Sequence, residues 1–293
     1  MDVTVTKCLR SRIKKDFIVE RKTLTKTTVI KVCIFAASLA AVVGIIMGQS
    51  EKAGFVSAGV GNNSCTTVNG RELPIYCVET NENVVALSFD AAWGNEDTDL
   101  ILDILKKNDV KATFFMTGGW VENYPEDVKK ILAAGHDLAN HSENHKNMSQ
   151  LSDGECQEEL MKVHNKVKEL TGYEMCLFRP PYGDYDNEVI CSATNCGYYT
   201  VQWSIDSLDW KNYGVNDIID RVCEHKALKP GAIILCHNGA EYTADALDDL
   251  IKGIKENGYT FVPISELIYK NNYYMKADGT QVSTLQNEST SLQ

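Results

Sequence analysis

The chain has 293 residues, 44% of them apolar, and a formal net charge of -11 at neutral pH. This composition excludes an intrinsically disordered protein and provides enough apolar residues for the core of one sizeable domain. The first 50 positions hold nine of the 29 basic residues but only three of the 40 acidic ones. The remainder is therefore strongly acidic, so we expect no nucleic-acid partner, and no sequence feature indicates a protein partner.

The N-terminus has the pattern of a membrane anchor. Residues 1–28 form a basic segment, which we expect on the cytoplasmic side, and residues 29–48 are apolar apart from Lys31 and a few small or polar positions. A bilayer needs about 20 apolar residues, and cations on the N-terminal flank favour an exported remainder. The sequence thus predicts a single transmembrane helix, a cell-membrane location and an extracytoplasmic main domain. A cleaved signal peptide and a buried core helix are the alternatives.

Composition divides the rest of the chain into three segments. Residues 49–80 are rich in Gly, Ser, Asn and Thr, which is typical of a linker, and they end in a short extended piece. Residues 81–270 are expected to form the main domain, and residues 271–293 a flexible tail because they hold few periodic apolar positions. Eight of the ten cysteines lie beyond the anchor, and Cys65 with Cys77 is the disulfide pair to test first.

Within the main domain, short apolar runs of strand length alternate with segments of helical period. The runs lie at 84–89, 112–116, 137–139, 177–178, 199–203, 232–236 and 260–262. One helical segment begins with a capping box formed by Ser152 and Glu155. This alternation, repeated about seven times, favours an α/β fold with parallel strands and helical crossovers, either closed into a barrel or open.

Side chains able to carry chemistry follow five of these strands. They are Asp90, His141 and His145, Arg179, Asp206 and Asp209, and His237. In a parallel α/β barrel the loops after the strands lie on one face, so we expect these groups to meet there. Any one of these residues alone would more often have only a structural role. Their occurrence after five different strands favours a functional site.

Three motifs suggest what these groups do. In HSENH, His141 and His145 are spaced so that two imidazoles can face the same way, and neutral imidazole is a common zinc ligand. Two surface or capping histidines are the alternative. In RPPYG, two prolines leave Tyr182 with the first backbone N–H of a stiff loop, a donor suited to an oxyanion, although a plain turn has the same composition. In ILCH, His237 beside a carboxylate would be a good general acid.

These three motifs and two others, SFDAAWG and DSLDW, resemble in their order along the chain those of the polysaccharide deacetylases, the NodB-homology domain of carbohydrate esterase family 4. SFDAAWG is similar to the family's (T/S)FDDG, HSENH to H(S/T)xxH, RPPYG to its arginine–proline loop, DSLDW to DxxDW and ILCH to LxH. The resemblance covers about residues 80–270 and implies a distorted (β/α) barrel. The variation within SFDAAWG resembles sporulation and cell-wall deacetylases of Gram-positive bacteria.

The resemblance implies a role for each acid–base residue. Asp90 would be the general base that takes a proton from the attacking water, and Arg179 would fix Asp90. His237 would protonate the departing amine, with Asp209 orienting its ring.

The resemblance also implies a metal and a sugar groove. His141 and His145 would hold a divalent cation, most simply zinc, with cobalt or manganese as alternatives. The Tyr182 amide would bind the oxyanion, and the rings of Tyr182 and Trp210 would wall the groove.

Ala91 departs from the family pattern, because it stands where a second aspartate normally completes the metal triad. A methyl group cannot ligate a metal. Water or a nearby acid such as Glu96 or Asp97 could fill the position, the metal could bind more weakly, or it could be absent.

These inferences together predict a metal-dependent hydrolase that removes N-acetyl groups from peptidoglycan amino sugars at the outer face of a bacterial membrane. N-acetylglucosamine and N-acetylmuramic acid are both open as the reacting sugar. A non-catalytic wall-binding protein, which the alanine at position 91 would favour, is the main alternative, and a metal-dependent amidohydrolase of another small substrate is the third.

Overall fold

The computed structural model describes residues 70–285. The chain divides into two units, residues 1–62 and 63–293, and all the described residues belong to the second. The predicted basic segment and transmembrane helix lie outside the described residues, as does Cys65. Within residues 70–285, no helix has the length and apolar character needed to cross a bilayer.

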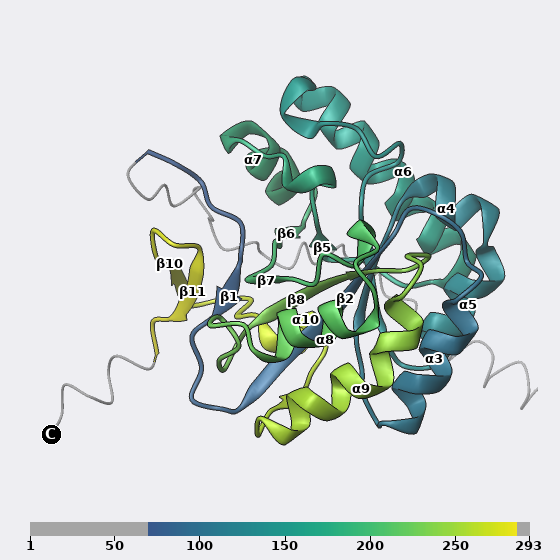
Figure 1. Ribbon diagram of the computed structural model, residues 1–293. Coiled ribbons are helices and arrows are strands. Elements are labelled where there is room, and N and C mark those ends of the chain that lie inside the picture. Colours follow the sequence, from purple (N-terminus) through teal and green to yellow (C-terminus); the bar gives the residue numbers. More distant parts are fainter. Residues whose placement is uncertain (1–69, 286–293) are drawn as a thin grey trace, which may run out of the picture. The chain divides into compact units, whose positions relative to one another are not determined.

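The centre of the domain is a parallel sheet curved into an incomplete barrel (Figure 1). Its strands are β2 (Val84–Ala91), β3 (Thr113–Met116), β4 (Asp137–Asn140), β5 (Leu177–Phe178), β6 (Tyr199–Thr200), β7 (Ile205–Asp206) and β8 (Ile233–His237). They lie in the order β6-β5-β4-β3-β2-β8-β7, every pair is parallel, and β9 (Thr260–Phe261) pairs with the start of β2. The predicted distorted (β/α) barrel of about seven parallel strands is confirmed.

Helices of the crossovers cover the outer face of this sheet (Figure 1). They are α3 (Thr98–Lys107), α4 (Gly118–Asn123), α5 (Pro125–Ala133), α6 (Asp153–Thr171), α7 (Asn187–Asn195), α8 (Val215–Cys223) and α9 (Thr243–Glu256). The short helix α10 (Ile264–Leu267) packs on the other face, in an apolar cluster with Ala86. The predicted capping box begins α6, where the Ser152 amide donates to Glu155 Oε2 at 2.9 Å. This box satisfies amides that have no partner inside the helix.

Side chains along β2 point alternately to the two faces of the sheet, and this alternation determines which face carries the site. Leu87, Phe89 and Ala91 belong to the large apolar cluster between sheet and helices, whereas Ala86 belongs to a smaller cluster on the other face. Because successive strand residues point to opposite faces, Asp90 shares the inner face with Ala86. A carboxylate at the end of this strand is thus directed to the inside of the barrel.

The predicted strand over 199–203 is wrong as a single element. Its residues continue from β6 at one edge of the sheet to β7 at the other edge, and the segment around Ile75 lies in the gap. The Ile75 amide donates to Thr200 O at 2.9 Å, and the Gln202 amide donates to Ile75 O at 2.8 Å. Ile75 is 4% exposed. The domain therefore begins before residue 81, and part of the predicted linker closes the barrel.

The tail predicted to be flexible from residue 271 is ordered as far as residue 285. β10 (Tyr273–Met275) and β11 (Thr280–Ser283) form an antiparallel hairpin, and β11 also pairs with β1 (Cys77–Val78). Gln281 is fully buried, and its side chain accepts from the Tyr269 amide and donates to the Tyr269 carbonyl. The hydropathy pattern misses this strand because polar side chains there are satisfied by backbone partners.

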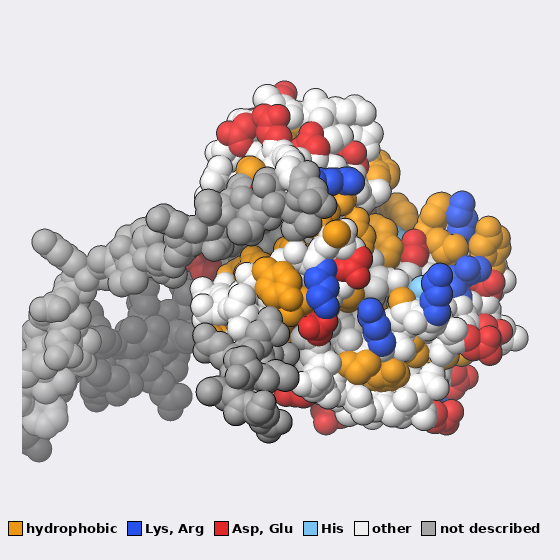
Figure 2. Space-filling view, turned by 90° about the vertical axis from the view of Figure 1, so that its left-hand side faces the viewer, with side chains coloured by type: hydrophobic (Ala, Val, Ile, Leu, Met, Phe, Trp, Pro, Cys, Tyr) orange, Lys and Arg blue, Asp and Glu red, His pale blue; other side chains and the backbone are white. Residues whose placement is uncertain are grey.

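Charged side chains are interspersed on the face shown in Figure 2. Acidic, basic and apolar side chains alternate there, without a continuous basic stripe.

Cys77, half of the predicted disulfide, is buried with its sulfur 3.3 Å from Thr280 Oγ1, and its expected partner lies outside the described residues.

Candidate active site

The strand-end side chains predicted from the sequence meet at the carboxyl end of the sheet. β2 and β8 are neighbours, and their register sets Asp90 opposite His237. Arg179 reaches this point from the end of β5, where its Nη1 donates to Asp90 Oδ1 at 2.6 Å. His141 follows β4, and its Nε2 lies 3.5 Å from Asp90 Oδ2. The parallel arrangement thus brings together groups that are up to 147 positions apart in the sequence.

Asp90 is 5% exposed and remains ionised in this setting. Burial alone would raise the pKa of its carboxyl group, but the charge and hydrogen bond of Arg179, together with the charge of His237, outweigh burial and lower the pKa below its ordinary value. The carboxylate is therefore a proton acceptor at neutral pH.

Arg179 is completely buried and fixed by several partners. Besides the bond to Asp90, its Nη2 donates to Ser88 Oγ at 2.8 Å and to Gln202 O at 3.2 Å. Its guanidinium lies over the Phe115 ring, 4.0 Å from the centroid, which is cation–π geometry. Sequence reasoning missed Ser88, although it stands two positions before Asp90 on the same face of β2.

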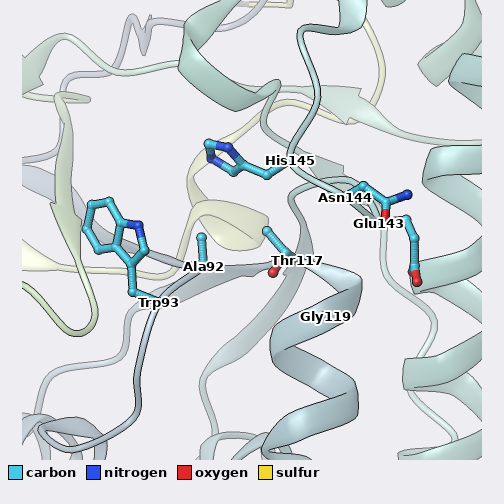
Figure 3. Close-up of a pocket in the computed structure, with 7 residues that line it drawn as sticks. All are labelled: Ala92, Trp93, Thr117, Gly119, Glu143, Asn144 and His145. Atoms are coloured by element: carbon cyan, nitrogen blue, oxygen red, sulfur yellow. The ribbon is translucent and has the colours of Figure 1, made fainter.

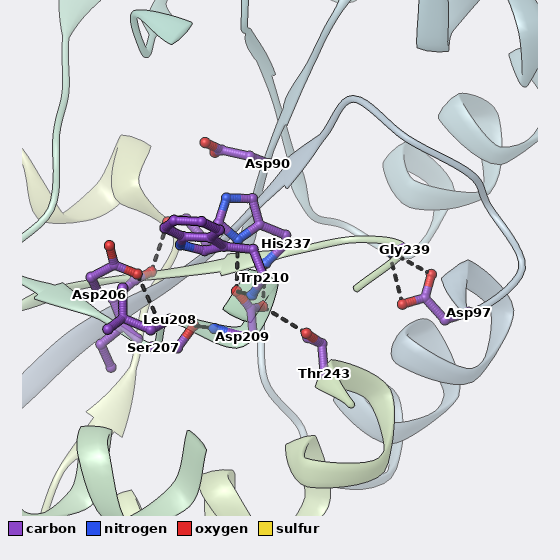
Figure 4. A network of polar contacts seen from close by, with 12 residues as sticks. Asp90, Asp97, Asp206, Ser207, Leu208, Asp209, Trp210, His237, Gly239 and Thr243 are labelled. Carbon is purple, nitrogen blue, oxygen red and sulfur yellow. Dashed lines mark hydrogen bonds and ion pairs between the residues drawn. The ribbon is translucent and has the colours of Figure 1, made fainter. Parts of the chain in front are cut away.

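His237 is held by Asp209, the pairing that the family resemblance implies (Figure 4). Asp209 Oδ1 lies 2.7 Å from His237 Nδ1, and Oδ2 accepts from the His237 amide at 2.7 Å. Burial opposes a charged imidazole, but the hydrogen bond and charge of Asp209, helped by Asp90 and Asp206, raise the pKa of His237. The ring is thus suited to carry a proton near neutral pH and to give it up through Nε2.

Asp209 is fully buried and has two further donors. Thr243 Oγ1 donates to its Oδ2 at 2.6 Å, and the Trp210 amide donates to its Oδ1 at 2.9 Å. Thr243 begins α9, and no sequence pattern connected that helix with the site. Asp206, the other acid of this loop, accepts from the Leu208 amide, and burial raises the pKa of Asp206.

The two histidines of HSENH also lie together, with ring centroids 4.9 Å apart. His141 Nδ1 lies 2.7 Å from the carbonyl of Arg179, so Nδ1 holds the proton and Nε2 presents a lone pair. Burial lowers the pKa of His141 to about 4 and also lowers the pKa of His145. Both rings are therefore neutral at pH 7, the form that binds a metal.

A strained loop sets the direction of His145. His145 and Ser142 both have positive φ, 53° and 65°, which side chains other than glycine seldom adopt. Ser142 Oγ accepts from the His145 amide at 3.0 Å, and the Ser142 amide donates to Asn140 Oδ1 at 2.9 Å. Asn140 is buried at the end of β4, so the sheet holds the strained turn in place.

Two exposed aromatic side chains lie beside these groups. Tyr182 has φ 60°, is 70% exposed, and meets the His145 ring edge-on at a centroid distance of 4.5 Å. Trp210 follows Asp209 and is 45% exposed. A pocket of about 320 Å³ continues the site past His145 (Figure 3). Exposed aromatic rings beside the site are suited to contact a sugar.

Comparison with known proteins agrees with this geometry. Residues 78–201 match the family model described as polysaccharide deacetylase. The peptidoglycan-N-acetylmuramic acid deacetylase PdaA of Bacillus subtilis is 36% identical over 199 residues, which cover 67% of this chain and 75% of that protein. The chain belongs to the polysaccharide deacetylase family. The expected membership in a family of hydrolases that act on carbon–nitrogen bonds is thereby confirmed.

The chain is also similar to two other members of the family, one named as an enzyme and one described as a pseudoenzyme. A peptidoglycan-N-acetylglucosamine deacetylase of Bacillus cereus is 38% identical over 200 residues, covering 66% of this polysaccharide deacetylase and 92% of that one. The solved structure of BA3943 from Bacillus anthracis, described as a pseudoenzyme of the CE4 family, is 38% identical, with a TM-score of 0.64 and coverage of 67% and 69%. A mutant of BA3943 is described as having restored enzymatic activity.

The site of this polysaccharide deacetylase has two imidazole ligands where three ligands are expected. Ala91 is fully buried, and residues 70–285 hold no group of three or more His, Cys, Asp and Glu side chains arranged for a metal. Asp97 does not fill the position, because its carboxylate accepts from the Gly239 amide at 2.9 Å and lies apart from Asp90 and His237 in Figure 4. The residues present fit a divalent cation held by two neutral imidazoles, with other positions open.

Proposed function

We propose that this protein is a metal-dependent deacetylase that hydrolyses N-acetyl groups of peptidoglycan amino sugars, N-acetylglucosamine or N-acetylmuramic acid, at the outer face of a bacterial membrane. The observation that carries the proposal is the pairing of Asp90 and His237 on adjacent strands. One is an ionised base with a lowered pKa and the other an acid with a raised pKa. Amide hydrolysis requires such a pair, because water must lose a proton and the amine must gain one.

The chain's own residues account for the proton movements. Asp90 Oδ2 takes a proton from the attacking water, while Arg179 keeps the carboxylate oriented through Oδ1. His237, oriented by Asp209, donates a proton from Nε2 to the departing amine. The backbone amide of Tyr182 would stabilise the oxyanion from the rigid RPPYG loop.

A divalent cation, zinc or else cobalt or manganese, would be held by His141 and His145. When bound, it would supply Lewis acidity to the acetyl carbonyl and to water. The Nε2 atom of His141 is prepared for this ligation because Nδ1 faces the Arg179 carbonyl.

Acetate release from purified peptidoglycan fragments tests this proposal. The full chain should release acetate, and a chelator should abolish the release until zinc or cobalt is restored. The double variant His141→Ala/His145→Ala should be inactive and bind no zinc. Release that continues undiminished in the double variant would exclude the metal mechanism.

The substrate choice is supported by relatives that are named as peptidoglycan deacetylases. The membrane location is supported by the apolar stretch 29–48 behind a basic segment. Membrane fractionation of the full chain tests the anchor. Recovery of a soluble protein that lacks the first 48 residues or so would instead support a cleaved signal peptide.

A non-catalytic glycan-binding protein is the second candidate, and Ala91 is the observation that favours it. The similarity to BA3943, described as a pseudoenzyme, adds weight to this possibility. Wild-type protein that binds peptidoglycan fragments but releases no acetate with any divalent metal would establish it.

A further inference from the structure

A third exposed aromatic side chain borders the site, and sequence reasoning assigned it no role. Trp93 follows the end of β2 and is 50% exposed. Its indole ring lies 5.2 Å from the His237 ring, at an interplanar angle of 30°. A single exposed aromatic side chain would need no explanation, but Trp93, Tyr182 and Trp210 are three such rings at the border of one site.

The backbone beside Trp93 is held by neighbouring side chains. Gly94 O accepts from Trp120 Nε1 at 3.1 Å and from Asn238 Nδ2 at 3.3 Å. Gly239 packs behind the residue, since a Cβ added to Gly239 would lie 3.5 Å from Trp93 Cβ, an ordinary van der Waals distance. These contacts fix the point from which the indole projects, which limits the conformational freedom that is lost when a ligand packs on the ring.

Trp93 also forms one wall of the pocket drawn in Figure 3. The pocket is about 320 Å³ in volume, close to the lower limit of roughly 300 Å³ for small-ligand pockets, which suits a single ring. Trp93 and His145 lie on two sides of it, with Ala92 and Thr117 between them (Figure 3). Because His145, one of the two proposed imidazole ligands, lines the pocket, the pocket adjoins the proposed reacting centre.

The charge of the lining selects the occupant. The described residues that line the pocket include neither Lys nor Arg, and its one acid, Glu143, is paired with Lys166 at 2.5 Å. Lys166 also pairs with Glu122, so its charge is already matched. A sugar that bears a carboxylate would find no free cation here, whereas an uncharged ring would be accepted. Thr117 Oγ1 accepts from the Trp120 amide and has a hydroxyl proton to donate to a sugar oxygen.

We propose that this pocket is an accessory sugar subsite, in which an uncharged N-acetylhexosamine ring next to the reacting sugar stacks on the indole of Trp93. The inference rests on the proposed function, because it takes the reacting sugar to lie between Asp90 and His237. Trp93 would thus determine how strongly the protein prefers a glycan chain to a single sugar.

Binding of N-acetylglucosamine and of its linear trimer to the full chain, measured by calorimetry, tests the subsite. All variants carry Asp90→Asn to prevent turnover. The trimer should bind more tightly than the monosaccharide, Trp93→Ala should weaken trimer binding about tenfold and leave monosaccharide binding nearly unchanged, and Trp93→Phe should retain most of the gain. Tyr274→Ala removes an exposed aromatic ring from β10, away from the pocket, and should change neither affinity.

The outcomes separate this inference from the proposed function. A trimer-to-monosaccharide affinity ratio that Trp93→Ala leaves unchanged would overturn the subsite alone. Absence of any saccharide binding in the Asp90→Asn chain would overturn the subsite together with the glycan substrate. Equal melting temperatures of the Trp93 variants and their parent would show that lost affinity does not come from unfolding.

Discussion

The acid–base half of the site and the metal-ligand half are built in different ways. In the first half, both oxygens of Asp209 accept hydrogen bonds, and the buried Arg179 pairs with Oδ1 of Asp90. In the second half, two neutral imidazoles are aimed by a backbone carbonyl and a strained turn. Position 91, where the family pattern has a third ligand, holds a methyl group that packs in the apolar cluster between sheet and helices.

The difference has a thermodynamic reason. Removing one partner of a buried ion pair costs about 3–5 kcal/mol, because the other charge is left uncompensated. The ligand half holds no net charge without a metal, so replacing a carboxylate by alanine there leaves no buried ion behind. The fold therefore constrains the acid–base half strongly and tolerates change in the ligand half.

Among single substitutions that keep the shape of the side chain, Asp90→Asn should reduce acetate release the most. The variant cannot accept a proton, so acetate release should fall about 10²- to 10⁴-fold. Asp103→Asn on the exposed face of α3 is the matched control and should keep full activity. If Asp90→Asn retained more than a tenth of wild-type activity, the base would have to be another group.

Asp209→Asn should move the pH profile and lower the maximum rate about tenfold to a hundredfold. His237 must be protonated to act as an acid, so activity falls as pH rises through its raised pKa. Loss of the Asp209 charge lowers that pKa and shifts the basic limb to lower pH. The acidic limb depends on ionised Asp90 and on neutral His141, whose pKa is about 4, and should stay in place.

Asp206→Asn is the matched control for the pH experiment. Asp206 raises the pKa of His237 less than Asp209 does, so its variant should shift the basic limb in the same direction but by less. A basic limb that does not move in Asp209→Asn would mean that His237 is not the acid.

The part of the site that the sequence predicts is the part that local patterns encode. Apolar runs fix where strands end, and parallel strands bring Asp90, His141, Arg179 and His237 to one face. Even the pairing of His237 with Asp209 was expected, because the resemblance to the polysaccharide deacetylases implies it. These features depend on the order of the motifs and on the period of the strands.

The part that the sequence does not predict depends on contacts between distant segments. Thr243 reaches Asp209 only because α9 begins beside β8, and Ile75 closes the barrel only because β6 and β7 lie at opposite edges. Ser88 is an intermediate case, since its strand parity places it on the face of Asp90 but nothing in the sequence names Arg179 as its partner. No local period carries such information.

Ala91→Asp tests how far the ligand half can be completed. A carboxylate at the end of β2 should raise zinc affinity at least tenfold, equivalent to about 1.4 kcal/mol. Without metal, the same variant should melt at a lower temperature than wild type, since it buries an unpaired carboxylate at a fully buried position. Added zinc should therefore raise its melting temperature more than that of wild type.

Ala91→Asn is the control for that comparison, because it has the same shape but is a poor ligand. It should melt early without gaining zinc affinity. Equal zinc affinities for Ala91→Asp and wild type would mean that position 91 does not face the cation.

Ser142→Ala should give the smallest effect, confined to the ligand half. The substitution removes the acceptor of the His145 amide, a hydrogen bond of 3.0 Å that is worth about 1 kcal/mol. If that bond holds the strained turn, zinc affinity should fall about fivefold, while the pH dependence set by His237 should not change. Ser149→Ala, an exposed serine of the same loop region, should leave zinc binding as it is. Within residues 70–285, Ser142 has no hydrogen bond with the Asp209 network. A shift in the basic limb of the pH profile of Ser142→Ala would therefore show that the two halves of the site are coupled.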